Sequence, residues 1–148
     1  MTNRMDTTTL GLMRIPEIPL QVDANALCLL PCEIQEFVSR LNFEAAVING
    51  FLWDNIIPLS NTDGVSCTKL CAFGSPSRDA YYIWIYNNET CKYEMYCTPY
   101  HHQSYLVEDF MATDAIGPIL QADTFAQFMH HITFDEVTFL DMCANRQD

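Results

Sequence analysis

Six residues with metal-binding or nucleophilic side chains gather in the middle third of the 148-residue chain: Cys67, Cys71, Cys91, Cys97, His101 and His102. Structural zinc sites bring two thiolates together across a tight turn, most often with two residues between them. The spacings here are wider, and cysteines four or six residues apart on a strand are separated by about 13 or 20 Å. We therefore interpret these cysteines as buried free thiols that pack as small apolar side chains, with a structural zinc site as the alternative.

The four histidines form two adjacent pairs, His101-His102 and His130-His131. Adjacent side chains point apart on a strand and diverge by about 100° on a helix, so neither pair is a natural chelate. Pairing Cys97 with His101, or His131 with Asp135, gives an alternative function as a small Cys/His-dependent hydrolase or transferase. Glycine-rich phosphate loops, the dinucleotide fingerprint and the zinc deaminase pattern are absent. We expect no catalytic residue, no metal and no cofactor.

The elements that would position these groups centre on residues 80–97, AYYIWIYNNETCKYEMYC, which predict a β-hairpin with a polar turn. A two-residue loop at 88–89 or a four-residue loop at 87–90 places Trp84 opposite Tyr93 and Tyr82 opposite Met95. Alternate residues of a strand share a face, so one face of this hairpin is wholly apolar. We expect that face, with Trp84 and Tyr93, to lie in the core.

The other face of the hairpin mixes Ile83 and Ile85 with Lys92 and Glu94, which is more apolar than a water-facing sheet surface needs. One interpretation is that a helix or the N-terminal segment of the same chain covers this face. The other is that a protein partner or a second copy binds there, because contiguous apolar patches mark interaction sites. On the second interpretation the partner-binding residues are Tyr81, Ile83, Ile85 and Tyr96.

Patterns elsewhere in the chain predict an α+β fold. We expect an antiparallel sheet of three to five strands, with a meander centred on 65–97, and we expect N- and C-terminal helices to cover this sheet. Residues 1–22 read as an extended arm whose end could add an edge strand, 23–143 as one globular domain and 144–148 as a tail. Residues 31–41 predict a helix, and 43–53 a second helix broken near 49–50, with a buried strand as the alternative. Residues 65–73 predict a strand, 105–111 a short helix and 123–132 a helix. A capping box at 133–136 predicts a last helix with Phe134, Val137 and Leu140 on one stripe, with a strand as the alternative.

Composition narrows the classes of function. The net charge is −12, of which residues 103–148 carry −7, so no basic patch exists to bind a phosphate backbone directly. No apolar run approaches the length that a bilayer requires, and the N-terminus lacks the apolar stretch of a signal peptide. We therefore expect a protein without membrane contact, its seven cysteines reduced, in the cytoplasm or nucleus. The whole sequence contains only two lysines, and such a scarcity of lysine suits a viral protein that avoids ubiquitination in its host cell.

Together these patterns predict a non-enzymatic intracellular protein-interaction module, viral or host-interaction accessory in type, that binds through an aromatic sheet face or edge and an acidic C-terminal surface. The partner is a protein, with a homodimer as an alternative. In element order and pI alone, the chain resembles the secretion chaperones that bind effectors as homodimers. An acidic mimic of nucleic acid is a further alternative, although charged residues are only 18% of the chain, which is few for such a mimic.

Overall fold

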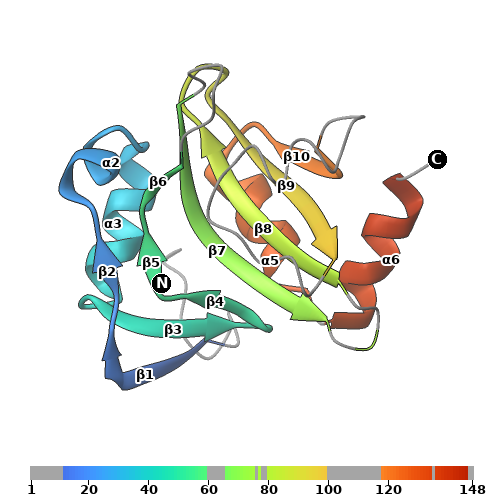
Figure 1. Cartoon of the computed structure of the whole chain (residues 1–148), viewed down its shortest axis with the longest axis horizontal. Coiled ribbons are helices and arrows are strands. Elements are labelled where there is room, and N and C mark those ends of the chain that lie inside the picture. Colours follow the sequence, from blue (N-terminus) through green and yellow to red (C-terminus); the bar gives the residue numbers. More distant parts are fainter. Residues whose placement is uncertain are drawn as a thin grey trace, which may run out of the picture.

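The computed structural model describes residues 12–59, 66–75, 77, 80–99, 118–134 and 136–146. These residues form a mixed α+β fold with a large antiparallel sheet and four helices (Figure 1). The helices are α2 (Ala24–Cys28), α3 (Cys32–Arg40), α5 (Phe125–Ile132) and α6 (Glu136–Arg146).

The sheet has eight strands in the order β1-β3-β4-β7-β8-β9-β10, with β6 paired to β7 beside this path. Its strands are β1 (Leu12–Pro19), β3 (Glu44–Ile48), β4 (Phe51–Trp53), β6 (Pro58–Leu59), β7 (Cys67–Ser75), β8 (Ala80–Asn87), β9 (Lys92–Pro99) and β10 (Leu120–Ala122). The short strands β2 (Gln21–Val22) and β5 (Asn55–Ile56) form a separate parallel pair. The expected three to five strands are therefore too few. The predicted meander is confirmed as β7-β8-β9, and the other strands extend it on both sides.

The β8–β9 hairpin keeps the predicted faces in a register shifted by two residues. Trp84 pairs with Met95 and Tyr82 with Cys97, so the expected pairs are wrong. The cause is the turn: the Asn87 side-chain oxygen accepts hydrogen bonds from the backbone N–H groups of Glu89 and Thr90, at 2.9 and 3.2 Å. Such an Asx-type turn keeps Asn87 in the strand and moves the loop to 88–91.

The helix predicted at 43–53 is wrong: this segment contains the strands β3 and β4, in line with the strand alternative. The turn between them has Asn49 at φ 49° and Gly50 at φ 91°, and glycine adopts such left-handed backbone without steric cost. Gly50 also lies against Phe73 of β7, where an added Cβ would come within 2.6 Å of the ring. The weak helix pattern of this segment is overridden because both strands bury alternate side chains in the core.

The predicted helices at 31–41 and 123–132 are confirmed as α3 and α5. Thr124 caps α5 by accepting the backbone N–H of Gln127 at 3.1 Å. The last segment is the helix α6, so the strand alternative there is wrong. Its stripe also differs from the prediction, because Val137 is 69% exposed while Phe139 is buried. The helix expected at 105–111 lies outside the described residues.

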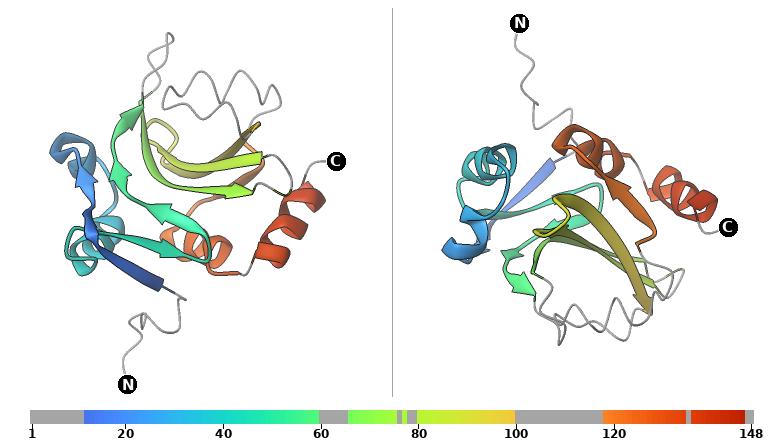
Figure 2. Two further views of the ribbon diagram at one scale, coloured as in Figure 1. Left: turned by 60° about the horizontal axis from the view of Figure 1, so that its bottom comes forward. Right: turned by 90° about the horizontal axis from the view of Figure 1, so that it is seen from above.

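The main core joins one face of the sheet to α3, α5 and α6, which lie on the same side of strands β7 to β9 (Figure 2). Phe128 of α5 is fully buried among rings from three strands; it stacks on Tyr93 at a centroid distance of 4.9 Å and meets Trp84 edge-on at 5.1 Å. Trp84 and Tyr93 are thus core residues, as expected. Among the described residues, no helix is both long and apolar enough to span a bilayer.

Candidate functional site

The face of the sheet that carries Ile83 and Tyr96, called the second face below, has an apolar row that crosses six strands. Residues directly opposite each other on paired strands share a face, and the pairing connects them in one line. From β1 to β9 the row is Met13, Val47, Leu52, Ala72, Ile83 and Tyr96. Met13 is 64% exposed, Val47 and Leu52 are partly buried, and the last three are buried. The side chains of the row are therefore buried on β7, β8 and β9 and become exposed toward the edge strand β1.

The predicted partner-binding residues gather in one small cluster on this face. Ile83, Ile85 and Tyr96 are 0%, 1% and 2% exposed, and Tyr81 packs against them, partly buried. Leu59 and Cys67 also belong to the cluster, and Ile57 packs against it; none of these described residues lies in a helix. Their role in binding stays a prediction, and a partner could contact this cluster only where its members reach the surface.

Two buried charges interrupt the second face. Lys69 is 1% exposed, and its Nζ lies 2.6 Å from the Asn55 Oδ1 and 3.4 Å from an Asp54 carboxylate oxygen. Burial lowers the pKa of Lys69, and the Asp54 carboxylate opposes that shift. Glu94 is also buried. Its oxygens accept hydrogen bonds from Tyr96 Oη at 3.0 Å, Gln121 Nε2 at 3.3 Å and Asn87 Nδ2 at 3.4 Å. Sequence periodicity places Glu94 on this face but does not reveal that it is buried. It does not place Lys69 there, because the register of β7 shifts between Lys69 and Cys71.

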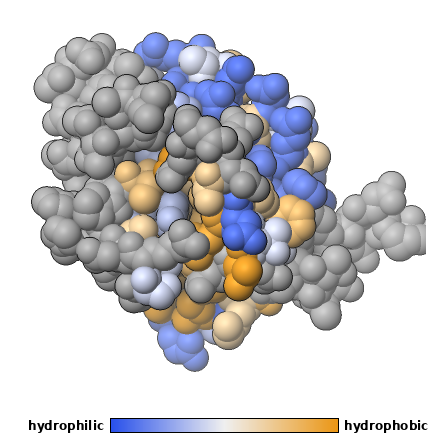
Figure 3. All heavy atoms as spheres, turned by 90° about the vertical axis from the view of Figure 1, so that its right-hand side faces the viewer, coloured by the Kyte–Doolittle hydropathy of each residue, from blue (hydrophilic) through white to orange (hydrophobic). Residues whose placement is uncertain are grey.

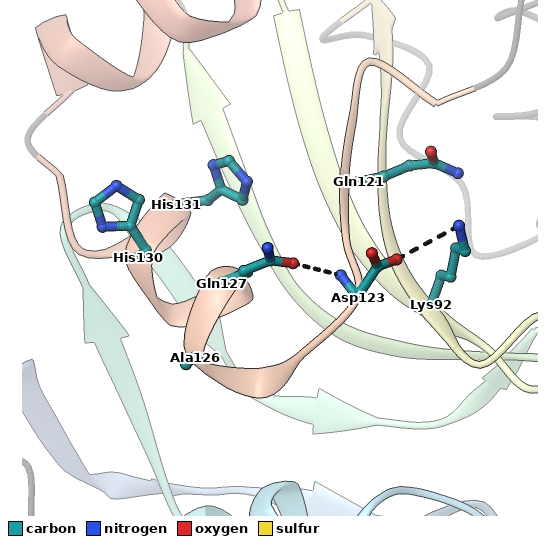
Figure 4. A pocket seen from close by; sticks show the side chains of 7 residues that line it. All are labelled: Lys92, Gln121, Asp123, Ala126, Gln127, His130 and His131. Atoms are coloured by element: carbon teal, nitrogen blue, oxygen red, sulfur yellow. Dashed lines mark hydrogen bonds and ion pairs between the residues drawn. The ribbon is translucent and has the colours of Figure 1, made fainter.

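An open polar hollow of about 580 Å³ lies between the ends of β9 and β10 and helix α5 (Figure 4). Lys92 and Asp123 form an ion pair on one side of it at 3.4 Å, and the Asp123 backbone N–H donates to Gln127 Oε1 at 2.8 Å. His130 and His131 lie on the opposite wall, in the last turn of α5. The His131 ring stacks on Trp84 at 5.8 Å. The histidine pair was singled out from the sequence, but its neighbours in the hollow were not.

The described residues do not assemble the Cys/His site of the alternative enzyme function. No cysteine is found among the described residues that line the polar hollow. Cys97 is partly buried and packs against the main core, while its proposed partner His101 lies outside the described residues, as does Asp135. Within the described ranges no three His, Cys, Asp or Glu side chains come together as a metal site.

The seven cysteines are all free thiols. Burial raises the pKa of Cys67 to about 12, with smaller contributions from the Glu94 and Glu89 carboxylates. Burial likewise raises the pKa of Cys71 well above its ordinary value. Both thiols therefore stay protonated and unreactive at neutral pH. These two residues behave as the small apolar side chains that their positions on a strand indicated.

A second hollow, of about 400 Å³, lies where α2, β6, the start of β7 and the 88–91 turn meet. We call it the apolar hollow, because most of its exposed lining is apolar. Leu59 and Cys67 of the second-face cluster form part of its wall, and Leu29, which is 61% exposed, lies at its side. This hollow is thus a place where the buried second-face cluster reaches the surface. No sequence pattern predicts this hollow, because its walls come from four separate segments.

On the side of the molecule shown in Figure 3, hydrophobic residues gather toward the lower centre and hydrophilic residues along the upper right margin.

Comparison of the chain with protein-family models, curated proteins and solved structures found no match.

Proposed function

We propose that this chain is a non-enzymatic protein-interaction module that binds a basic protein partner through the accessible margins of its second face. The observation that carries the proposal is the apolar row, which continues from the buried Ile83 and Tyr96 to an exposed end at Met13. Exposed apolar side chains that continue a buried cluster are typical of interaction sites. In this proposal Ile83, Ile85 and Tyr96 are the buried residues that support the surface contacted by the partner, and Tyr81 lies at the edge of that surface.

The face, rather than the backbone edge, is the better contact surface. Strand β1 is an edge strand, and its unpaired backbone groups could in principle accept a further strand. However, Pro16 and Pro19 lack the N–H groups that such pairing needs, and the register of β1 shifts between Ile15 and Pro19. Strand addition would therefore be limited to the first half of β1, which leaves the side chains of the face to supply most of the contact.

The charge of the chain indicates the chemistry of the partner. A net charge of −12 repels a second copy and attracts a basic surface, because complementary potentials guide association and like charges oppose it. The acidic C-terminal third contributes −7 to this field. A basic protein is therefore a better occupant of the face than a homodimer, and the intracellular compartment expected from the sequence stays part of the proposal.

The test is a selection from a random-peptide display library with the full-length protein as bait. Peptides that combine apolar residues with Lys or Arg should be enriched, and those among them that bind at the β1 margin of the second face should lose binding to a Met13→Glu, Leu52→Glu double variant. Val137→Glu on α6 is the matched control and should bind like the wild type. Enrichment of acidic peptides, or no enrichment, would contradict the proposal. A concentration-dependent dimer in light scattering that the double variant abolishes would instead assign the face to self-association.

A further inference from the structure

The apolar hollow combines an open apolar space with a hydrogen-bond acceptor that has no partner. Asn88 donates through Nδ2 to Ser66 Oγ at 2.9 Å and to Thr68 Oγ1 at 3.3 Å, while its Oδ1 is buried without a hydrogen-bond partner. Leaving such an acceptor unsatisfied costs about 1–3 kcal/mol, so an unpaired buried atom calls for an explanation. Asn88 lines the hollow, so a turn of its side chain would present this oxygen to a ligand in which an N–H donor lies next to an apolar group.

The walls of the hollow fit an aliphatic side chain. Leu29, Pro58 and Leu59 supply apolar surface from α2 and β6. The Cys67 thiol adds a small uncharged group, because it stays protonated at neutral pH. A space of about 400 Å³ lies within the range of small-ligand pockets and is larger than one leucine side chain needs. The hollow can therefore hold an anchor residue together with part of its backbone.

The charges at the hollow are acidic. Among the described residues of its lining, Asp23 is the charged one, and the Ala26 backbone N–H donates to one of its carboxylate oxygens at 2.9 Å. The Glu89 carboxylate lies next to the wall, where it accepts the Ser66 backbone N–H at 3.3 Å. An apolar anchor with cationic neighbours on either side would therefore be attracted, whereas one with anionic neighbours would be repelled.

We propose that the hollow between α2, β6, β7 and the 88–91 turn receives an aliphatic anchor residue from a Lys- or Arg-containing segment of the protein partner, an inference that rests on the proposed function. The anchor packs on Leu29 and Leu59, its backbone N–H donates to Asn88 Oδ1, and its basic neighbours face Asp23 and Glu89. The site would then select partners by charge and by the size of one side chain.

Three synthetic peptides test this assignment by NMR titration of the isotope-labelled full chain: a central leucine flanked by lysines, the same leucine flanked by glutamates, and a central serine flanked by lysines. The lysine-flanked leucine peptide should shift the amide signals of Leu29, Cys67 and Asn88, and the other two should bind at least about tenfold more weakly. Leu29→Ser should weaken its binding by about tenfold, the effect of losing part of a buried leucine contact, while Val137→Ser should not.

The possible failures are distinguishable. Binding that shifts the signals of Met13 and Leu52, and that Leu29→Ser leaves unchanged, would overturn the hollow as the anchor site and keep the proposed function. Equal binding of the glutamate-flanked peptide would overturn the charge selection. If none of the peptides binds anywhere on the chain, the hollow assignment is overturned, and the display selection then decides the proposed function independently.

Discussion

Lys69 and Glu94 are charged residues that the chain buries on a face otherwise suited to apolar packing. A buried charge is tolerated when hydrogen bonds and an opposite charge replace water. Asp54 and Asn55 do this for Lys69, and three donors do it for Glu94. The centre of the second face is therefore buried with its charges paired, and among the described residues its accessible side chains lie at the margins, as at Met13.

Two glutamate substitutions on the same apolar row should differ strongly in their effect on stability. Ile83→Glu places an unpaired carboxylate in a site with no exposure, so the free energy of unfolding should fall by about 3 kcal/mol or more. Met13→Glu changes a largely exposed residue and should alter stability by no more than about 0.5 kcal/mol. Urea denaturation followed by tryptophan fluorescence measures both. A fully stable Ile83→Glu variant would show that this residue is accessible in solution.

Alkylation rates distinguish the interaction module from a cysteine-dependent enzyme. Cys28, Cys32 and Cys91 are exposed and should react first with iodoacetamide in the native protein. Cys67, Cys71 and Cys143 are buried and should react only as the chain unfolds. Peptide mass spectrometry over a time course reports each site. If Cys97, which is partly buried, reacted far faster than the exposed cysteines, the hydrolase or transferase alternative would gain its missing nucleophile.

Alkaline pH should destabilise the fold through its buried thiols. In the unfolded chain Cys67 ionises near its ordinary pKa of 9.0, whereas in the fold its pKa is about 12. The folded state then binds more protons than the unfolded state, so this stabilisation is complete below pH 9.0 and is lost as pH rises toward 12. Within that window each such thiol lowers the free energy of unfolding by about 1.4 kcal/mol per pH unit.

Cys71→Val tests this linkage, because burial raises the pKa of the Cys71 thiol in the same direction. The variant should lose less stability than the wild type when urea denaturation is repeated across the alkaline range. Cys28→Val at an exposed site is the control and should follow the wild type. Parallel losses in all three proteins would mean that the buried thiol does not contribute.

At the scale of elements, the sequence predicted the helices and strands that a pattern of nearby residues encodes. The i, i+3, i+4 spacing of Ile34, Phe37 and Val38 was sufficient for α3, and the aromatic alternation of 80–97 for the β8–β9 faces. Register was not predictable, because it depends on one hydrogen-bonding side chain, that of Asn87. Residues 43–53 were assigned wrongly because two short buried strands and one short buried helix have similar composition, and only the turn at Gly50 separates them.

The β3–β4 turn should be intolerant of a side chain at its glycine. Gly50→Ala forces a Cβ to within 2.6 Å of the Phe73 ring at a φ of 91°, which combines backbone strain with overpacking. We expect a loss of about 2 kcal/mol or more in the free energy of unfolding. Asn42→Gly is the matched control: Asn42 is exposed with φ 57°, so glycine there should be neutral or slightly stabilising. Thermal denaturation of both variants checks the difference, and equal stabilities would show that the turn relaxes.

At the scale of the whole molecule, the candidate surfaces arise from long-range pairing. The apolar row joins residues from 13 to 96 through six strands, and the apolar hollow joins 23–29, 58–59, 66–68 and 88. No local pattern encodes such juxtapositions, so neither could be predicted from the sequence. Net charge, by contrast, is a property of the composition: the value of −12, on which the proposal of a basic partner rests, is the same whichever strands lie next to each other.

The most direct measurement of the central claim is the affinity of the full chain for the lysine-flanked leucine peptide as a function of salt, by fluorescence anisotropy of a labelled peptide. An acidic module with an apolar anchor site should bind this peptide more tightly than its glutamate-flanked counterpart, and the difference should shrink as salt screens the charges. A residual preference for leucine over serine should persist at high salt, because apolar burial is not screened. Equal affinity for all of these peptides at every salt concentration, or no binding at all, would contradict the account.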